Sequence, residues 1–476
     1  GKIASGIALV GEVSDRVRAR VMAAGELMAT ELGAAYLASL GLDARLVDAR
    51  TLLSATPRRG ATDRASVLSA TCDFTPEPAL AARLAPASAV VVTQGFIARD
   101  ADGHTVLLGR GGSDTSAAYL AARLSATRLE IWTDVPGMFS ANPRTVPNAR
   151  LLKSLHYDEA QEIATSGAKV LHPRCILPVR THSIPLHVYS TPAPEQPGTV
   201  ISATPADSGA QVKAIALRKG ITLVSMDSPG MWHQVGFLAD AFRVFKEHGL
   251  SIDLVSTSET NVTVSLDPQA NTLDAAALDG LVEDLAALCR VRLIGPCASL
   301  SLLGRNIRGI IHRLGEAFEL FEERKIHLIS QAANDLNFTF VIDEDQGDRL
   351  VSQLHELLIR AAPGDPVLGP TWQQLHAPPA AAARPATPWW SRRRADLLAR
   401  LDGRDCAYVY DLDTVRAQAR SLASMRSLGR ALYAIKANAN REVLEAVADC
   451  GLSFECVSRG EVERVREALP GLDRGR

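Results

Sequence analysis

LLGRGGSDTSAAYLAARLSATRLEIWTDVPGMFSANPR, residues Leu107–Arg144, is the stretch of this chain whose local structure the sequence predicts most clearly. It combines a Gly-rich turn, a helical run over Thr115–Leu124, an apolar strand over Leu129–Trp132 and a polar loop that ends at Arg144. The polar loop follows the carboxyl end of the strand, where open α/β sheets bind their ligands. The stretch therefore predicts a β-α-β unit of a layered α/β fold, with a ligand site at its edge.

The turn itself, Arg110–Asp114, has the chemistry of an anion site. Its two glycines allow a ligand close to the backbone, and the free N–H groups at a helix start favour negative charge. Arg110 adds a planar guanidinium that suits a carboxylate or a phosphate. The same Gly-Gly-Ser-Asp sequence is also typical of an ordinary turn and N-cap. It has neither the ending of a Walker loop nor the spacing of a dinucleotide fingerprint.

The composition indicates a globular protein of roughly three domains, since the chain has 476 residues and a domain averages about 150. Apolar residues make up 47% of the chain and charged residues 22%. A net charge of −2 without a basic stripe argues against nucleic-acid binding, and no apolar run reaches the roughly 20 residues that span a membrane. Seven dispersed cysteines without zinc-like spacing predict reduced thiols, a cytoplasmic location and no metal-binding side chains.

Strand–helix alternation extends the first unit in both directions. A helix is predicted over Ser14–Leu40, and strands over Ala44–Val47 and Ala89–Thr93. Another helix is predicted over Tyr157–Thr165, ahead of a loop with the sequence GAKVLHP. Such alternation is typical of a layered α/β domain.

An internal repeat follows from about residue 212. Ala241–Phe245 (AFRVF) is echoed by Ala317–Phe321 (AFELF), and a pair of β-rich segments follows each copy. Each copy predicts the β-α-β-β-α-β order of a ferredoxin-like unit. The predicted strand pairs are Ser251–Ser256 with Asn261–Leu266, and Lys325–Ser330 with Asn337–Ile342. Exposed sheet edges of such units favour sheet-to-sheet association within or between chains.

The last part of the chain predicts a linker and the beginning of a parallel βα series. Residues 361–394 are rich in Pro and Ala, as interdomain linkers are. Beyond them, strands are predicted over Ala407–Asp411, Ala431–Lys436 and Leu452–Val457, each followed by a helix. Lys436 ends an apolar strand, where a βα barrel has its active site, although a lysine at a strand end more often reaches solvent.

Five motifs of the first part resemble those of the aspartate kinases, nearest to the lysine-sensitive type. They are GEL at 25–27, TQGF at 93–96, LGRGGSD at 108–114, IWTDVPGMFSANPR at 131–144 and GAKVLHP at 167–173. The resemblance extends from about residue 14 to residue 360 and includes the repeat, which is similar to the paired ACT domains of that family. It implies transfer of a phosphoryl group from ATP, with Mg²⁺, to the side-chain carboxylate of L-aspartate. It also implies that one ACT unit is interrupted by the other.

The resemblance implies a role for individual residues of the kinase part. Arg110 would clamp the aspartate carboxylate, with Ser113 and Glu26 completing the substrate site, and Asp114 would lie near the phosphates and the metal. Five residues would line the ATP site: Thr133, Asp134, Phe139, Arg144 and Lys169. Phe139 stands where the family has a tyrosine, so ring packing is kept and a hydroxyl contact is lost. Phosphoryl transfer to a carboxylate needs no strong base, because the nucleophile is already ionised.

The string SPGMWHQVGFLADAF resembles the lysine-binding segment of the same family. Its implied members, with those of the following strand, are Met231, Gly236, Leu238, Ser251, Asp253, Thr257, Ser258 and Glu259. Asp253 and Glu259 would receive the ammonium groups of L-lysine, and the ACT units would form a homodimer. The alternative is that these polar side chains only cap turns and helices, as Asp, Ser and Thr commonly do.

Nothing before Gly25 resembles the Lys-Phe-Gly-Gly-Thr-Ser loop with which the family begins. The resemblance therefore implies that the first part of the kinase domain is missing, and it predicts that the chain as given is inactive. Such a gap also fits a different class of protein, an amino-acid-binding regulator with a degenerate kinase remnant. A related kinase acting on glutamate or carbamate is a third possibility, which the tandem ACT units disfavour.

The last part resembles the beginning of a diaminopimelate decarboxylase. The matching segments are YVYD at 408–411, YAIKANAN around Lys436 and FECVSRGE at 454–461. The resemblance implies that Lys436 would hold pyridoxal 5'-phosphate in a complete barrel. The predicted domains are then 1–211 for a truncated kinase, 212–295 and 296–362 for two ACT domains, 363–395 for the linker and 396–476 for the start of the barrel.

Overall fold

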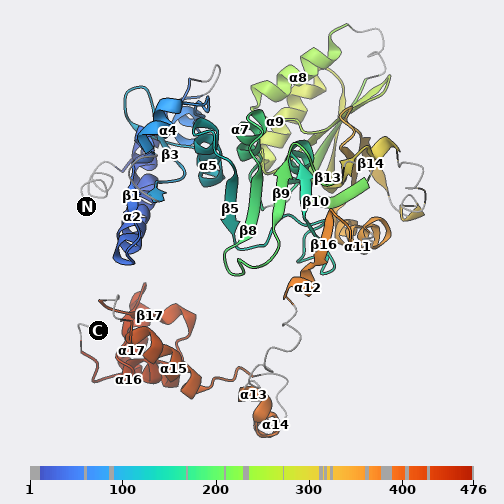
Figure 1. Ribbon diagram of the computed structural model, residues 1–476. Helices are drawn as coiled ribbons and strands as arrows, with labels where there is room; N and C mark the ends of the chain where they lie inside the picture. Colours follow the sequence, from blue (N-terminus) through green and yellow to red (C-terminus); the bar gives the residue numbers. More distant parts are fainter. Residues whose placement is uncertain are drawn as a thin grey trace. The chain divides into compact units, whose positions relative to one another are not determined.

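The computed structural model divides into two compact units, residues 1–377 and residues 378–476 (Figure 1). The structure describes residues 11–57, 62–84, 90–167, 170–207, 209, 211–228, 235–271, 273–309, 315, 319–321, 325–359, 364–376, 389–401, 407–425 and 429–473. Helices and strands alternate in both units, so the expected α/β fold class is confirmed.

The first unit begins with α2 (Asp15–Ser39), the Ala-rich helix that the sequence predicts. The Ser14 side chain accepts the backbone N–H of Val17 and so caps the helix start. The helix ends just before Gly41, whose φ of 80° lies in the left-handed region.

A parallel strand pair and a hairpin follow α2. β1 (Ala44–Leu46) pairs with β2 (Val90–Val92), and β3 (Ile97–Arg99) pairs with β4 (Thr105–Leu107). Buried alanines of α2 pack on the hairpin, so the helix backbone lies close to it. The same layer contains η1 (Ala49–Thr51), α3 (Asp63–Leu68) and α4 (Pro78–Leu84).

α5 (Gly112–Arg123) carries the Gly-rich turn at its start and begins at Gly112 rather than at Thr115, where the sequence predicts it. Gly111 is the N-cap with a φ of 65°, which places Ser113 and Asp114 in the first helical turn. α5 leads into β5, the edge of a four-stranded sheet of order β5-β8-β9-β7. Its elements and flanking helices are β5 (Leu129–Thr133), β7 (Ser154–His156), α6 (Tyr157–Thr165), η2 (Pro173–Cys175), α7 (Ile176–Thr181), β8 (Leu186–Ser190) and β9 (Thr199–Ser202).

The repeat region forms one six-stranded sheet of order β11-β12-β10-β13-β15-β14. Two long central strands, β10 (Gln211–Asp227) and β13 (Arg290–Arg305), run antiparallel through both repeats. The other elements are α8 (Phe237–Glu247), β11 (Val255–Thr257), β12 (Asn261–Leu266), α9 (Ala275–Ala286), β14 (Ile326–Ser330), β15 (Asn337–Asp343), η5 (Glu344–Gln346) and α11 (Gly347–Leu358). In the second copy of the repeated motif, Ala317 and Phe318 lie outside the described residues.

The sheet consists of two ferredoxin-like halves that share β10 and β13. The first half contains β11, β12, the end of β10 and the beginning of β13. The second half contains β14, β15, the end of β13 and the beginning of β10. The second half thus takes one strand from before the first half in sequence, and the expected boundary at residues 295/296 falls inside β13.

One predicted strand of this region is shorter than expected. Ser251–Ser256 was expected to be extended, but β11 begins only at Val255. The backbone of Ser251 is held instead by the side chain of Asn271, which accepts its N–H and donates to its carbonyl. A side-chain amide thus replaces a neighbouring strand at this position.

Part of the predicted linker is folded. β16 (Leu368–Thr371) pairs with β6 (Arg150–Leu152) of the α/β part, and α12 (Trp372–His376) follows it. The Lys153 backbone donates to the carbonyl of Val367, and Val367 and Leu368 are buried. The chain therefore returns to the α/β part after the six-stranded sheet.

The second unit contains α13 (Trp389–Arg392), α14 (Arg394–Leu401), α15 (Leu412–Ala423), β17 (Leu432–Ala434), η6 (Ile435–Ala437), α16 (Arg441–Asp449), β18 (Ser453–Glu455) and α17 (Arg459–Ala468). β17 and β18 are parallel, as the βα pattern predicts. The strand expected over Ala407–Asp411 is not formed, and Asp411 is instead the N-cap of α15, accepting the backbone N–H of Thr414. Among the helices that the structure describes, none has the length and hydropathy needed to cross a membrane.

Candidate functional site

The Gly-rich turn fits tightly between two other segments. A Cβ on Gly111 would lie 2.2 Å from Cγ of His172, so a side chain is excluded here by space as well as by conformation. On the other side, a Cβ on Gly95 would lie 2.9 Å from Oγ of Ser113. The turn is therefore held between the segment Gln94–Phe96 and the loop that carries His172.

Hydrogen bonds connect the same segment to α2, which carries Glu26. The Gln94 side chain donates to Oγ1 of Thr30 and accepts the backbone N–H of Ala49, both at 2.8 Å. Thr30 in turn donates to the carbonyl of Glu26 at 2.8 Å. Gln94 is buried, so these bonds fix the half-buried Glu26 and the Gly-rich turn on one common scaffold.

The charges at the turn influence one another. Burial raises the pKa of Asp114, while a backbone hydrogen bond from His172 and its imidazole act in the opposite direction. Burial also lowers the pKa of His172, and Arg174 and Arg110 add to that effect. The Arg110 and Ser113 side chains are exposed and accessible to a ligand. A half-buried carboxylate such as Asp114 is the type of group that a bound magnesium ion would stabilise.

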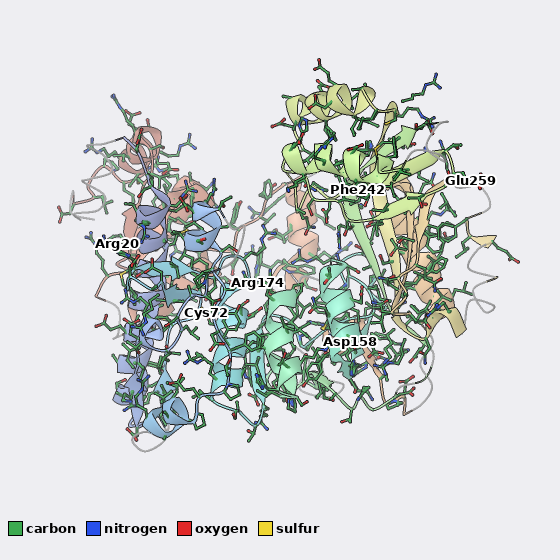
Figure 2. The ribbon with its side chains drawn as sticks, turned by 90° about the horizontal axis from the view of Figure 1, so that it is seen from above. Arg20, Cys72, Asp158, Arg174, Phe242 and Glu259 are labelled. Carbon is green, nitrogen blue, oxygen red and sulfur yellow. The ribbon has the colours of Figure 1, made fainter. Side chains whose placement is uncertain are left out.

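Arg174 stabilises the Gly-rich turn by hydrogen bonds to the backbone next to it. Its guanidinium donates to the carbonyls of Leu108, at 2.5 Å, and Ala70, at 2.8 Å. In Figure 2 it reaches toward the segment that carries Cys72. Sequence reasoning did not single out Gln94, His172 or Arg174, although two of them lie within the TQGF and GAKVLHP motifs and Arg174 follows directly.

The residues expected at the nucleotide lie beyond β5. Thr133 ends this strand and donates through its hydroxyl to the carboxylate of the exposed Asp134. Arg144 is exposed further along the same loop. Phe139 is only 6% exposed and packs edge-on against Trp372 at 5.2 Å between ring centroids, so its ring faces the protein interior. Lys169 lies outside the described residues.

The residues expected at the lysine site follow β11 and the start of α8. Gly236 is the N-cap of α8 with a φ of 93°, and Leu238 is exposed in its first turn. Ser251 and Asp253 precede β11, while Thr257, Ser258 and Glu259 lie at its end and in the turn to β12. All of these residues are exposed, and Met231 lies outside the described residues.

Arg218 links this segment to the α/β part. Its guanidinium pairs with Asp253 at 3.2 Å and with the nearly buried Asp267 at 2.6 Å. It also donates to the carbonyl of Thr165 at the end of α6. Arg218 therefore joins Asp253 to the end of α6.

The second half of the sheet meets α6 through a buried ion pair. Lys213 of β10 and Glu159 of α6 are 2.8 Å apart, and both side chains are fully buried. Arg305 of β13 approaches the same carboxylate at 3.2 Å. Arg305 also lines an open polar pocket of about 720 Å³. Its walls are His156, Asp158, Gln161, Glu162, Arg180, Arg305, Asn306, Asn334 and Leu336.

In the second unit, Lys436 lies in η6, directly after β17. Its side chain is exposed at the carboxyl end of a parallel strand pair. This position fits an amine that forms a Schiff base with pyridoxal 5'-phosphate.

Residues 1–190 match the amino acid kinase family, and residues 412–471 match the pyridoxal-binding domain of pyridoxal-dependent decarboxylases. The chain is 35% identical over 343 residues to lysine-sensitive aspartokinase 3 of Escherichia coli, covering 70% of this chain and 74% of that protein.

Two crystal structures of E. coli aspartokinase III are similar to this chain. The complex with aspartate and ADP superimposes with a TM-score of 0.63 at 33% identity, and the complex with lysine and aspartate with a TM-score of 0.60 at 32% identity. Each comparison covers 75% of this chain and 80% of the other.

Proposed function

Because this chain belongs to the aspartokinase family, we propose that it transfers the γ-phosphoryl group of ATP to the side-chain carboxylate of L-aspartate. The product is 4-phospho-L-aspartate, and the reaction serves amino-acid biosynthesis. The observation that carries this proposal is the Gly-rich turn of α5, whose exposed cation and hydroxyl are fixed on a buried scaffold. The similar E. coli aspartokinase III was crystallised with aspartate and ADP, which supports the same substrates here.

We propose that Arg110 holds the α-carboxylate of aspartate, with Ser113 and Glu26 as neighbouring contacts. The reacting carboxylate is already ionised, so the site needs no general base. It needs cations to offset the charge that gathers between two anionic reactants. Mg²⁺ bound with ATP would supply part of this charge, and Asp114 is the proposed protein contact for it.

We propose that Thr133, Asp134, Phe139, Arg144 and Lys169 line the nucleotide site. The Phe139 ring also packs against Trp372, which supports the loop. Arg144 and Lys169 would approach the phosphates as cations, whereas Thr133 and Asp134 offer hydrogen bonds.

The decisive test is a coupled assay of aspartate-dependent ADP formation by the complete gene product. Arg110→Ala is expected to lower kcat/KM for aspartate by about 10²–10³-fold, the effect typical of one lost charge-stabilising contact. Arg128→Ala is the matched control, because Arg128 is exposed and pairs only locally with Glu130 at 2.7 Å. An unchanged rate in Arg110→Ala would contradict the site assignment.

We also propose that L-lysine inhibits the enzyme by binding along β11 and the start of α8. Asp253 and Glu259 would receive its ammonium groups, and Met231, Gly236, Leu238, Ser251, Thr257 and Ser258 would surround it. Isothermal calorimetry with lysine tests binding, and threonine serves as the control amino acid. We propose a homodimer through the six-stranded sheet, which light scattering after gel filtration would measure as twice the chain mass.

For the second unit we propose the beginning of a diaminopimelate decarboxylase, in which Lys436 would hold pyridoxal 5'-phosphate in a complete barrel. When bound, this cofactor withdraws electrons from the substrate's α-carbon. Lys436 is the one lysine of residues 378–476, so borohydride reduction followed by peptide mapping has a single target there. In a protein with the complete barrel, a reduced adduct on Lys436, lost in Lys436→Ala, would support the proposal, and the absence of any adduct would refute it.

A further inference from the structure

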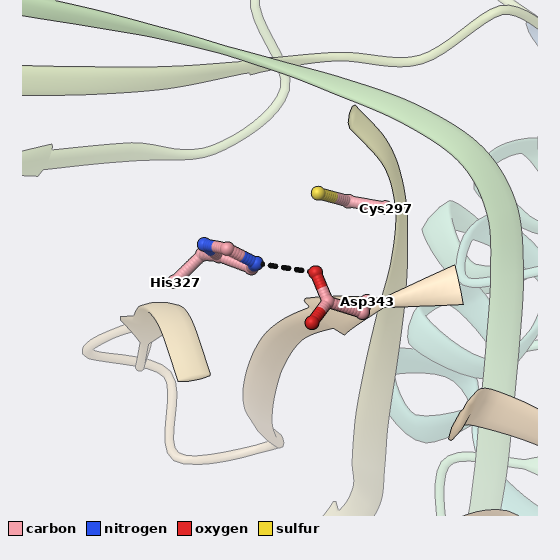
Figure 3. Close-up of side chains that lie close together, drawn as sticks. All are labelled: Cys297, His327 and Asp343. Carbon is pink, nitrogen blue, oxygen red and sulfur yellow. Dashed lines mark hydrogen bonds and ion pairs between the residues drawn. The ribbon is translucent and has the colours of Figure 1, made fainter. Parts of the chain in front are cut away.

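Three side chains with metal-binding atoms converge at one end of the second half of the six-stranded sheet (Figure 3). Cys297 of β13 and Asp343 of β15 are direct partners across the two strands. His327 of β14 places its Nε2 2.8 Å from Oδ1 of Asp343. The sulfur, nitrogen and oxygen atoms all lie within 4.8 Å of one another.

A local irregularity in β14 positions the histidine. Ile326 pairs with Ile342 and Leu328 with Val341, so His327 is an extra residue in this strand. Such a β-bulge redirects the side chain of the inserted residue. A second irregularity lies in β13 immediately before Cys297, where the register to β10 shifts. The convergence thus depends on two departures from the regular ladder.

From this arrangement we propose that Cys297, His327 and Asp343 bind one zinc-like divalent ion. Sulfur, imidazole nitrogen and carboxylate oxygen are the ligands that Zn²⁺ prefers, and the thiolate disfavours Mg²⁺ and Ca²⁺. Thiolate and carboxylate together balance the two charges of the ion. Asp343 is 43% exposed, so water can reach a fourth position, while His327 is only 4% exposed and fixed in place.

Binding of the ion would change the protonation state of Cys297. Burial raises the pKa of the Cys297 thiol to about 11, and the neighbouring Asp343 and Glu344 add to the increase. A bound cation reverses this, and binding releases the thiol proton to solvent. Typical zinc–ligand lengths of about 2.0–2.3 Å require the His327–Asp343 contact to open by roughly half an ångström.

The ordinary alternative is a hydrogen-bonded pair beside a buried thiol. The chain provides a comparison in His248 and Asp284, which lie 2.7 Å apart but are more exposed and belong to no such cluster among the described residues. Cys297 also belongs to a small apolar cluster with Leu328 and Val341, so an ion would tie the edge strand β14 to the centre of the sheet.

The test uses Co²⁺ as a spectroscopic probe on the complete protein after removal of bound metals. We expect one ion per chain and a thiolate-to-cobalt charge-transfer band in the near ultraviolet. Cys297→Ser should abolish the band. His327→Asn should weaken binding by more than the roughly 10–100-fold that loss of an outer-shell partner causes.

Cys289→Ser and His248→Asn are the matched controls and should bind Co²⁺ as the unchanged protein does. Zn²⁺ should displace Co²⁺ and so remove the band. The zinc-bound protein should melt at a higher temperature than the metal-free protein. The proposal is overturned if Co²⁺ gives no charge-transfer band, or if the band persists in Cys297→Ser. Neither result bears on the kinase assignment, which has its own assay.

Discussion

The two halves of the six-stranded sheet have the same topology but different surroundings. The first half builds its own core from the end of β10, α8, β12 and α9, which includes Phe237, Phe245, Leu281 and Leu285. In the described residues of the second half, Ile215, Leu302, Phe340 and Leu354 instead belong to one cluster with residues of the α/β part. The same fold thus serves once as a self-contained module and once as an extension of the catalytic core.

This difference suggests a division of labour. The second half is fixed to α6 by the buried Lys213–Glu159 pair and to Ser140 by His355. The first half contains the exposed segment proposed for lysine and reaches the α/β part through Arg218. We therefore expect changes in the second half to reduce stability and catalysis together. Changes in the first half should affect regulation.

The largest effect is expected for Glu159→Gln, which leaves the buried Lys213 ammonium without its counter-charge. Breaking one side of a buried ion pair costs about 3–5 kcal/mol of unfolding free energy. Denaturant unfolding measures this change. Asp348→Asn is the control. Asp348 pairs with the exposed Lys219, which lies on β10 as Lys213 does, so this substitution should cost at most about 1 kcal/mol. Equal effects of the two substitutions would contradict the proposed fixed attachment.

The next largest effect on the free energy of unfolding is expected when one buried leucine is truncated in either half. Leu285→Ala and Leu354→Ala each remove a fully buried side chain, and each should cost about 2–5 kcal/mol. We expect Leu285→Ala to weaken lysine inhibition while aspartate-dependent ADP formation persists. Leu354→Ala should lower ADP formation itself. If both variants lose activity equally, the first half is not the self-contained module that its core suggests.

A smaller effect concerns the pH dependence of stability. Burial lowers the pKa of His355 from its ordinary value of 6.5 to about 4, with Arg150 adding to the effect. The unfolded chain therefore binds the proton more readily between these values, and stability falls as the pH drops from 6.5 toward 4. The loss between pH 7 and pH 5 should be about 2 kcal/mol. His355→Gln should remove this component, as unfolding curves at both pH values would reveal.

The smallest effect on stability is expected for Asp253→Asn. Its ion pair with Arg218 is partly exposed, so the cost should be at most about 1 kcal/mol. Lysine inhibition should weaken markedly, because the variant loses both an ammonium contact and the link through Arg218. Inhibition curves at several lysine concentrations measure this, with Asp240→Asn on the exposed side of α8 as control. An unchanged inhibition constant would remove Asp253 from the proposed effector site.

Much of the fold could be predicted where local chemistry decides it. Tyr157–Thr165 and Asn261–Leu266 have the predicted bounds. For the helix, His156 and Glu159 form a capping box at its start. Two predicted strands differ from the structure. The Asn271 side chain takes the backbone partners of Ser251, and Asp411 is the N-cap of α15 instead of a strand residue.

The candidate site was predictable only in part for a similar reason. The Gly-rich turn could be predicted because its residues are adjacent in the sequence. The Lys213–Glu159 pair could not be predicted, because no local sequence pattern relates the two positions. The expectation of no metal-binding side chains rested on spacing along the chain. Cys297, His327 and Asp343 are far apart in sequence and meet at irregularities of β14 and β13 that no spacing along the chain reveals.

The pairing of β16 with β6 makes the six-stranded sheet an insertion whose two ends are anchored to the same body. The chain enters the sheet through β10 and rejoins the α/β part at Leu368. The α/β part is therefore built from segments that precede and follow the six-stranded sheet in sequence. A single proteolytic nick within the sheet would therefore leave two fragments that remain associated. The same arrangement should tolerate fragment complementation, in which separately expressed pieces of the first unit reassemble around the shared strands.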